Sequence, residues 1–384
     1  MIINTDVRLP RIVLASVALG GIVGVVVAGF DYLVIHVLLE HLLEQDLWVQ
    51  ATAPLIGLGL AALLLRIPGG GTTPSTSDEY VRAFHERSPQ LPLRELPAKL
   101  LAGAATIGAG GSLGLEGPSI YAGATIGQNL QDTFSRFFRR DEAKVLLTAG
   151  AAAGVAAIFR TPATGVMFAL EAPYRDDVAR RALLPSLIAS ATSFIVFATL
   201  LGTGRVFPTL GSFDRQIDVL DLLGGAVIGL VAGLAGRGYA WLVRQAKALS
   251  TDVHAVGRVV AAGVLLGLMV LASDALFDDV VTLGPGLEAV EWLLEEDRSL
   301  GLIAGLFAFQ LAATMITIGG GGTGGLFIPL AVQGVIMGSF IGSVVGEEQT
   351  SLYPTLGLAA FLGAGYRVPI TCLLYTSDAA DDLA

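Results

Sequence analysis

Long stretches without a charged side chain recur throughout this 384-residue chain, and they limit its folding choices more than any other feature. Hydrophobic residues make up 53% of the sequence and charged residues only 15%, against about 25% charged residues in a typical soluble domain. The uncharged runs cover residues 12–30, 47–65, 100–115, 145–159, 182–204, 222–236, 259–273, 299–346 and 349–366. We therefore predict an all-α polytopic membrane protein, because helices satisfy their own backbone hydrogen bonds in lipid.

The lengths of these runs predict two kinds of helix. Several approach the roughly 20 residues that cross a bilayer, whereas others stop at about 15 and contain glycine. We expect the short ones to enter the membrane without crossing it, which is tolerated where their ends are buried in protein or line a cavity. The first run is long enough to span and lacks a convincing cleavage site, so we expect it to be a retained helix.

Charge and cysteine usage exclude several classes of function. The formal net charge of −10 gives no basic footprint for nucleic acid, so no nucleic-acid partner is expected. A single cysteine, Cys372, excludes an intramolecular disulfide framework and a multi-cysteine metal site. We predict no metal and no cofactor. Residues 82–99 and 133–144 carry mixed charges and are predicted to be solvated connections.

One carboxylate lies within an otherwise uncharged stretch. Glu116 is the only charged residue between Lys99 and Asp132, in the segment GGSLGLEGPSIYAGATIG that covers residues 110–127. An ionisable side chain at membrane depth is expensive and is a functional candidate by default. The alternative is that Glu116 is merely interfacial.

The chain also contains an internal repeat. Residues Gly110, Gly111, Gly114, Leu115, Pro118, Gly123 and Gly127 recur 211 positions later as Gly321, Gly322, Gly325, Leu326, Pro329, Gly334 and Gly338, and Ser112 falls opposite Thr323. A second block recurs at an offset of 207, from Ala152, Ala153, Arg160, Pro162 and Thr164 to Ala359, Ala360, Arg367, Pro369 and Thr371. Similar halves with glycine-broken segments at corresponding places indicate a transport site between repeats.

The repeat predicts the domain boundaries. We expect a first membrane repeat over residues 1–205 and a second, incomplete repeat over residues 206–375. By the offset, the counterpart of the run at 182–204 would begin near residue 389, and the acidic, small-residue stretch 376–384 is expected to be a truncated or non-native tail.

Each repeat has a glycine-rich turn followed by an apolar helix with proline in its first turn, GLEGPSI in one and GGLFIPL in the other. Proline near a helix start wastes no hydrogen bond, and the free N–H groups there carry about half a positive charge. A third glycine-rich loop, at residues 68–76, is predicted to open a helix near Thr76 with a Ser or Thr cap. Such ends from two inverted repeats, meeting near the membrane midplane, would bind an anion weakly enough to let it pass.

These motifs closely resemble those of the CLC family of chloride channels and chloride/proton antiporters. GLEGP at 114–118 is similar to that family's G-[K/R]-E-G-P element, GGLFIP at 324–329 to its G-G-x-F-x-P element, and GGTTP at 70–74 to its G-S-G-x-P element. The resemblance implies an inverted-repeat fold in a homodimer with one anion pathway in each subunit. The length, without cytosolic regulatory domains, is typical of a prokaryotic plasma-membrane protein.

The resemblance assigns roles by matching position. Glu116 would be the gating glutamate, and Glu116 with Glu171 would form the proton pathway. Anion-binding positions would be Gly71, Thr72, Leu115, Gly117, Leu326 and Phe327.

Four departures from the family pattern bear on mechanism. Gly71 stands where the family has an anion-binding serine, with Thr72 as a neighbouring hydroxyl, and Leu115 replaces the basic residue before the gating glutamate. Ala172 stands where many antiporters have an internal proton-accepting glutamate, directly after Glu171. The helices that carry the family's central tyrosine would lie beyond the last residue.

We therefore expect transport of small monovalent anions, chloride first, and leave passive and proton-coupled movement open. Ala172 favours a passive channel, and the short, bacterial-type length favours an antiporter. A membrane-embedded enzyme is the alternative of another class, but the histidines are scattered and no nucleophile–base set falls in corresponding segments, so we predict that the protein is not an enzyme. A truncated, non-transporting remnant is the third alternative.

Overall fold

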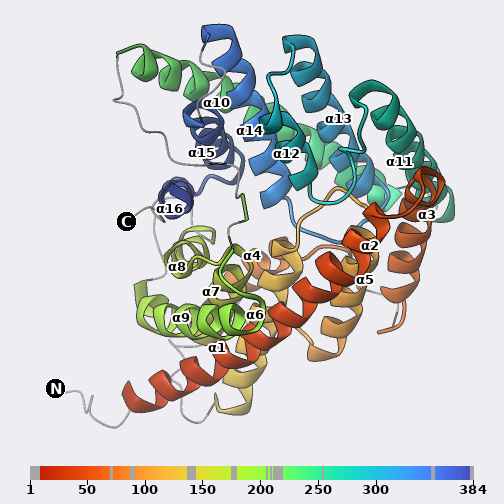
Figure 1. Cartoon of the computed structure of the whole chain (residues 1–384). Helices are drawn as coiled ribbons and strands as arrows, with labels where there is room; N and C mark the ends of the chain where they lie inside the picture. Colours follow the sequence, from red (N-terminus) through yellow and green to blue (C-terminus); the bar gives the residue numbers. More distant parts are fainter. Residues whose placement is uncertain are drawn as a thin grey trace. The chain divides into compact units, whose positions relative to one another are not determined.

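The computed structural model describes residues 9–69, 72–86, 91–135, 144–173, 180–204, 206–207, 210, 219–252, 255–346 and 351–380. Within these ranges the regular structure is helical, apart from one isolated two-residue bridge (Figure 1). Contacts divide the chain into two compact units. Unit 1 comprises Met1–Tyr32, Ser75–Leu100 and Glu116–Val206, and unit 2 comprises Leu33–Pro74, Leu101–Leu115 and Phe207–Ala384.

Unit 1 is built around α7, which is buried along its whole length. Helices α1, α6, α8 and α9 all pack against it. The helices of this unit are α1 (Leu9–Asp31), α4 (Ser77–His85), η2 (Leu93–Glu95), the start of α5 (Leu96–Gly108), α6 (Glu116–Thr133), α7 (Val145–Phe159), α8 (Pro162–Glu171), η5 (Arg180–Ala182) and α9 (Leu183–Leu201).

Unit 2 contains a corresponding buried pair, α14 and α15, together with longer helices that pack around it. Helix α15 contacts α10, and α14 contacts α12 and α13. The helices of this unit are η1 (Tyr32–Leu39), α2 (Glu40–Leu43), α3 (Leu47–Leu64), the rest of α5, α10 (Val219–Asp252), α11 (Ala255–Phe277), α12 (Leu287–Glu295), α13 (Leu300–Gly319), α14 (Phe327–Val345), α15 (Leu352–Tyr366) and α16 (Pro369–Ala380).

Two helix lengths are present, as the uncharged runs predict. Among the described residues, seven helices are long and apolar enough to cross a membrane: Pro10–Leu43, Leu47–Leu64, Leu183–Leu201, Val219–Ser250, Ala255–Phe277, Leu300–Gly319 and Phe327–Val345. Helices α5, α7, α8 and α15 have only 13, 15, 10 and 15 residues. At about 1.5 Å per residue they are shorter than a hydrocarbon core of about 30 Å. The prediction of half-spanning helices is confirmed.

Glycine lets the central helices of each unit approach unusually closely. Gly123 on α6 faces Gly150 on α7, and a Cβ at either position would overlap the other's carbonyl oxygen. Gly334 on α14 and Gly357 on α15 meet in the same way. Because these two pairs are related by the sequence offsets of 211 and 207, the α6–α7 and α14–α15 pairs are structural copies of one motif.

The ends of α7 and α15 also match. Arg160 and Arg367 occupy the C-cap positions, and both have a φ of 59°. A side chain larger than that of glycine or asparagine is uncommon in this left-handed region. The same helix termination, followed two residues later by Pro162 and Pro369, therefore supports the repeat at the level of the backbone.

The compact units do not coincide with halves of the sequence, because Leu33–Pro74 and Leu101–Leu115 belong to unit 2. The predicted repeat boundaries at residues 205 and 375 and the predicted tail at 376–384 therefore stay predictions. Helix α16 continues to Ala380, and residues 381–384 lie outside the described part of the chain.

Candidate functional site

The loops that lead into α6 and α14 are paired. Gly114 N donates to Gly325 O at 2.9 Å, and Gly325 N donates to Gly114 O at 2.7 Å. These two glycines are each other's counterparts in the repeat, and they form the isolated antiparallel bridge. A residue that pairs in this way with its own repeat mate marks a local pseudo-twofold axis, which is the geometry expected of inverted repeats.

Glu116 is the first residue of α6 and is only 1% exposed. It stands two residues after the bridge, and its neighbours Leu115 and Gly117 are buried as well. The first N–H groups of a helix have no partner within the helix and carry partial positive charge. The structure thus places a buried carboxylate at a position where negative charge is favoured.

The second helix start has an apolar side chain in the equivalent place. Phe327, the first residue of α14, is 1% exposed, and its ring centroid lies 5.6 Å from that of Tyr366. Leu326 is half-buried at the N-cap and makes no side-chain capping hydrogen bond. Leu115 and Leu326 directly follow the two glycines of the bridge.

The loop before α4 confirms one expectation and corrects another. Helix α4 does begin after Thr76, but the Thr76 side chain makes no capping hydrogen bond. Instead, Ser75 Oγ contacts Asp78 Oδ2 at 3.2 Å. Thr72 lies half-buried in this loop, and Gly71 lies outside the described residues.

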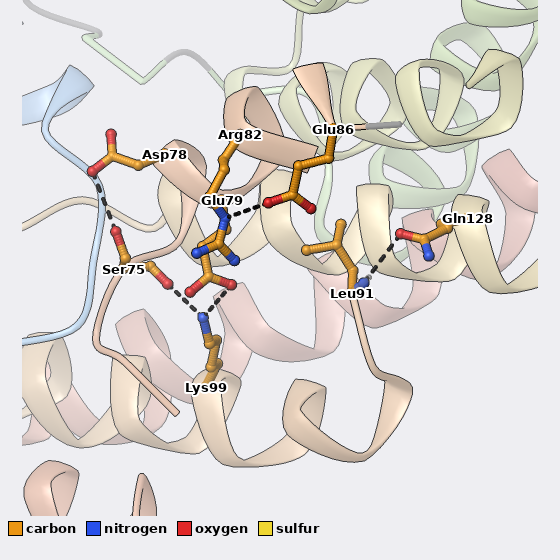
Figure 2. Close-up of polar contacts among 8 residues, drawn as sticks. All are labelled: Ser75, Asp78, Glu79, Arg82, Glu86, Leu91, Lys99 and Gln128. Carbon is orange, nitrogen blue, oxygen red and sulfur yellow. Dashed lines mark hydrogen bonds and ion pairs between the residues drawn. The ribbon is translucent and has the colours of Figure 1, made fainter. Parts of the chain in front are cut away.

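Lys99 is a buried cation that the sequence analysis assigned wrongly to a solvated connection. It is 0% exposed, and its Nζ lies 2.7 Å from Glu79 Oε2 and 2.6 Å from the carbonyl oxygen of Ser75 (Figure 2). The same ammonium lies 4.3 Å from the centroid of the Tyr121 ring on α6. Lys99 therefore ties the loop before α4 and the first turn of α4 to α5, beside α6.

The charged side chains of Arg82, Glu86 and Arg94 in this segment are exposed, as predicted. Arg82 Nε and Glu86 Oε1, 3.5 Å apart, form a surface pair on α4. Below it, Leu91 N donates to Gln128 Oε1 at 3.2 Å and links the segment before α5 to α6 (Figure 2). Lys99 differs from these residues because it immediately precedes the uncharged run at 100–115 and lies one helical turn inside α5. Its position next to that run was the one sequence feature that could have indicated its burial.

Glu171 is the last residue of α8 and is 8% exposed, and Ala172 follows at the C-cap. Helix α8 packs against α7 and α9 within unit 1. A carboxylate is thus buried here even though the following position has no acid. Glu116, Gly117 and Glu171 belong to unit 1, whereas Leu115, Leu326 and Phe327 belong to unit 2.

Short helices with buried N-termini, paired repeat loops and seven candidate spans among the described residues together define a polytopic helical membrane protein with an inverted repeat. The family model described as "Voltage gated chloride channel" matches residues 57–383. The chain therefore belongs to the voltage gated chloride channel family, and transport of anions across a membrane is its class of function.

Solved structures show the same fold. The slow cyanobacterial Cl−/H+ antiporter has a TM-score of 0.81 at 23% identity, covering 97% of this chain and 90% of that one. A CLC-type fluoride/proton antiporter has a TM-score of 0.80 at 23% identity, covering 97% and 91%. A eukaryotic CLC transporter has a TM-score of 0.72 at 18% identity, covering 96% and 67%. The predicted inverted-repeat fold is confirmed.

Proposed function

We propose that this protein moves chloride, or a similar small monovalent anion, along a pathway gated by Glu116. The observation that carries the proposal is a buried carboxylate at the start of α6, in a member of this family, two residues from the bridge between the repeats. In its charged form the carboxylate would compete with the anion for the N–H groups. Protonation or outward rotation of Glu116 would release that place.

The anion would be held by backbone N–H groups at the loop and helix starts. The positions proposed to face it are Gly71, Thr72, Leu115, Gly117, Leu326 and Phe327. Helix N-termini bind anions without a full positive charge. Such weak binding suits conduction, because an ion must leave as readily as it enters. No enzymatic step, metal or cofactor belongs to this proposal.

Efflux of chloride from loaded liposomes tests transport itself. Liposomes that contain the purified protein should release chloride faster than protein-free liposomes when potassium movement by valinomycin balances the charge. Fluoride in parallel tests the choice of anion, since one structural relative is a CLC-type fluoride/proton antiporter. Release of neither anion, from correctly folded protein, would favour the non-transporting remnant.

A second question is whether anion transport is coupled to the movement of protons. Two structural relatives are a Cl−/H+ antiporter and a fluoride/proton antiporter, which favours coupling and a proton path through Glu116 and Glu171. Ala172 favours passive movement, because the position after Glu171 has no carboxylate to receive protons. An imposed anion gradient should drive protons uphill if transport is coupled, and it should leave the internal pH unchanged if transport is passive.

We also propose a homodimer in a prokaryotic plasma membrane. The similarity to a cyanobacterial antiporter over 97% of this chain supports the location. Light scattering of the detergent-solubilised protein tests the assembly. A protein mass of about twice 39.7 kDa is expected, and a mass near 39.7 kDa would contradict the dimer.

A further inference from the structure

Two threonine hydroxyls, one in each repeat, accept hydrogen bonds from loop N–H groups of the other repeat. Thr106 Oγ1, on α5, accepts from Thr323 N at 3.1 Å. Thr317 Oγ1, on α13, accepts from Ser112 N at 3.2 Å. Thr106 and Thr317 are repeat mates at the offset of 211, and so are Ser112 and Thr323. Each half of the repeat therefore holds the loop of the other half.

The match extends to the second bond of each hydroxyl. Thr106 Oγ1 donates to Ala102 O at 2.8 Å, and Thr317 Oγ1 donates to Ala313 O at 2.7 Å. Ala102 and Ala313 are again related by the offset of 211. Since each hydroxyl donates within its own helix, its lone pair is oriented to accept the N–H group of the other repeat's loop.

The threonine methyl groups close the same contact. A Cβ at Gly111 would come within 2.9 Å of Thr106 Cγ2 and 3.2 Å of Thr317 Cγ2. A Cβ at Gly322 would lie 2.8 Å from Thr317 Cγ2 and 2.9 Å from Thr106 Cγ2. Thr106 and Thr317 are 1% and 0% exposed, so water does not compete for these hydrogen bonds.

The paired loops lead directly to the helix starts. Gly114 is two residues before Glu116, and Gly325 is two residues before Phe327. A loop held at Ser112 and Gly114, or at Thr323 and Gly325, leaves little freedom for the N–H groups that follow. We propose that Thr106 and Thr317 are positioning residues, whose hydroxyls align the helix starts of the opposite repeat for anion binding.

This inference rests on the proposed function, because it concerns the same anion-binding helix starts. It assigns a different role from that of the anion-binding positions. Neither threonine is proposed to touch the anion, and each acts through a loop of the other repeat. A shift of the binding groups by about 1 Å can cost on the order of a hundredfold in activity. Loss of either hydroxyl should therefore weaken anion binding more than it slows the maximal rate.

The test compares Thr106→Val and Thr317→Val with Thr106→Ser and Thr317→Ser. Valine keeps the shape and removes the acceptor, whereas serine keeps the hydroxyl. Anion flux is measured against anion concentration in proteoliposomes. We expect each valine variant to raise the apparent KM roughly tenfold or more, with a smaller change in maximal rate, and each serine variant to stay within about twofold of the wild type.

Thr148→Val is the matched control. Thr148 is fully buried on α7, and its hydroxyl donates to Lys144 O within the same chain segment. This variant should leave the KM unchanged. The same KM in the Thr106, Thr317 and Thr148 valine variants would overturn the inference, as would serine variants as impaired as the valine variants.

Alanine variants of Thr106 and Thr317 provide a second comparison, because serine and alanine differ only by the hydroxyl. If the valine and alanine variants fail to fold while the serine variants fold, the hydroxyls are needed for folding and the positioning role is wrong. Absence of flux in the wild-type protein would instead contradict the proposed function, so the two failures are distinguishable.

Discussion

The ion pair between Lys99 and Glu79 brings a positive and a negative charge together inside unit 1. Lys99 is fully buried and the Glu79 side chain is 11% exposed. Removal of one partner leaves the other charge buried without compensation, which typically costs about 3–5 kcal/mol. We expect Lys99→Met to lower the melting temperature of the purified protein strongly.

Two variants sharpen this prediction. Lys99→Met combined with Glu79→Leu should recover much of the loss, since no lone charge is left buried. Arg82→Met, which breaks the exposed Arg82–Glu86 pair at the C-terminal end of α4, should change the melting temperature little. Equal effects of Lys99→Met and Arg82→Met would contradict the assigned role of burial.

Glu288, on the short helix α12, has a different electrostatic environment. Burial raises the pKa of this carboxyl, and the nearby carboxylates Glu291, Asp279 and Glu40 raise it further. The folded protein therefore holds this proton more tightly than the unfolded chain does. Stability from this group is present at low pH and is lost as the pH rises from the ordinary glutamate pKa through the raised one.

Glu288→Gln should consequently raise the melting temperature at neutral pH and have little effect below about pH 4, near the ordinary glutamate pKa. The measurement is the difference in melting temperature between variant and wild type across this pH range. Glu295→Gln, at an exposed position of the same helix, is the control. A difference that does not grow with pH would contradict the expected direction.

At the residue scale, sequence reasoning found the groups that stand out from their neighbours. Glu116 was identifiable because one carboxylate interrupts a long uncharged run. Lys99 was missed because it lies where charged and uncharged sequence meet, and only the fold shows which way it points. Thr106 and Thr317 were also missed, although extending the offset of 211 toward the N-terminus by four residues would have paired them.

At the element scale, the close α6–α7 contact depends on the missing side chain of Gly123. A methyl group there would overlap the backbone of Gly150, which cannot move aside as a flexible side chain can. Overpacking of this kind typically costs about 1–3 kcal/mol. We expect Gly123→Ala to lower the melting temperature, and Gly334→Ala to act in the same direction because it faces the backbone of Gly357.

Gly233→Ala provides the control for these two variants. Gly233 is exposed on α10, and a Cβ there would have no atom within 4 Å. Alanine in a helix interior is favoured over glycine by about 0.5–1 kcal/mol, so this variant should be neutral or slightly stabilising. If all three variants had the same effect, helix propensity rather than close packing would explain the glycines.

Element lengths could be predicted from the uncharged runs, whereas a change of helix type within an element could not. The short run at 145–159 predicted α7 with its observed bounds. The first helix runs to Leu43, but its segment Tyr32–Leu39 is π-helical, which the run did not predict. A change in hydrogen-bonding pattern inside an apolar helix leaves no periodic signal in the sequence.

At the scale of the whole molecule, the repeat connects sequence, fold and function. Its offset predicted which segments correspond. The bridge between Gly114 and Gly325 shows that two corresponding loops pair with each other. The sequence could not predict that contacts would group Leu101–Leu115 with the second half of the chain. That grouping follows from pairing between loops that are distant in the sequence. The local pattern of hydrophobic and charged residues does not predict such pairing.

Gating of anion movement by Glu116 can be tested by the pH dependence of anion flux. Chloride flux through the wild-type protein should change with pH, because protonation removes the carboxylate that competes with the anion. Glu116→Gln, which mimics the protonated side chain, should transport chloride with little or no pH dependence, while the exposed-site control Glu295→Gln should respond as the wild type does. A Glu116→Gln protein that keeps the wild-type pH response would show that Glu116 is not the gate.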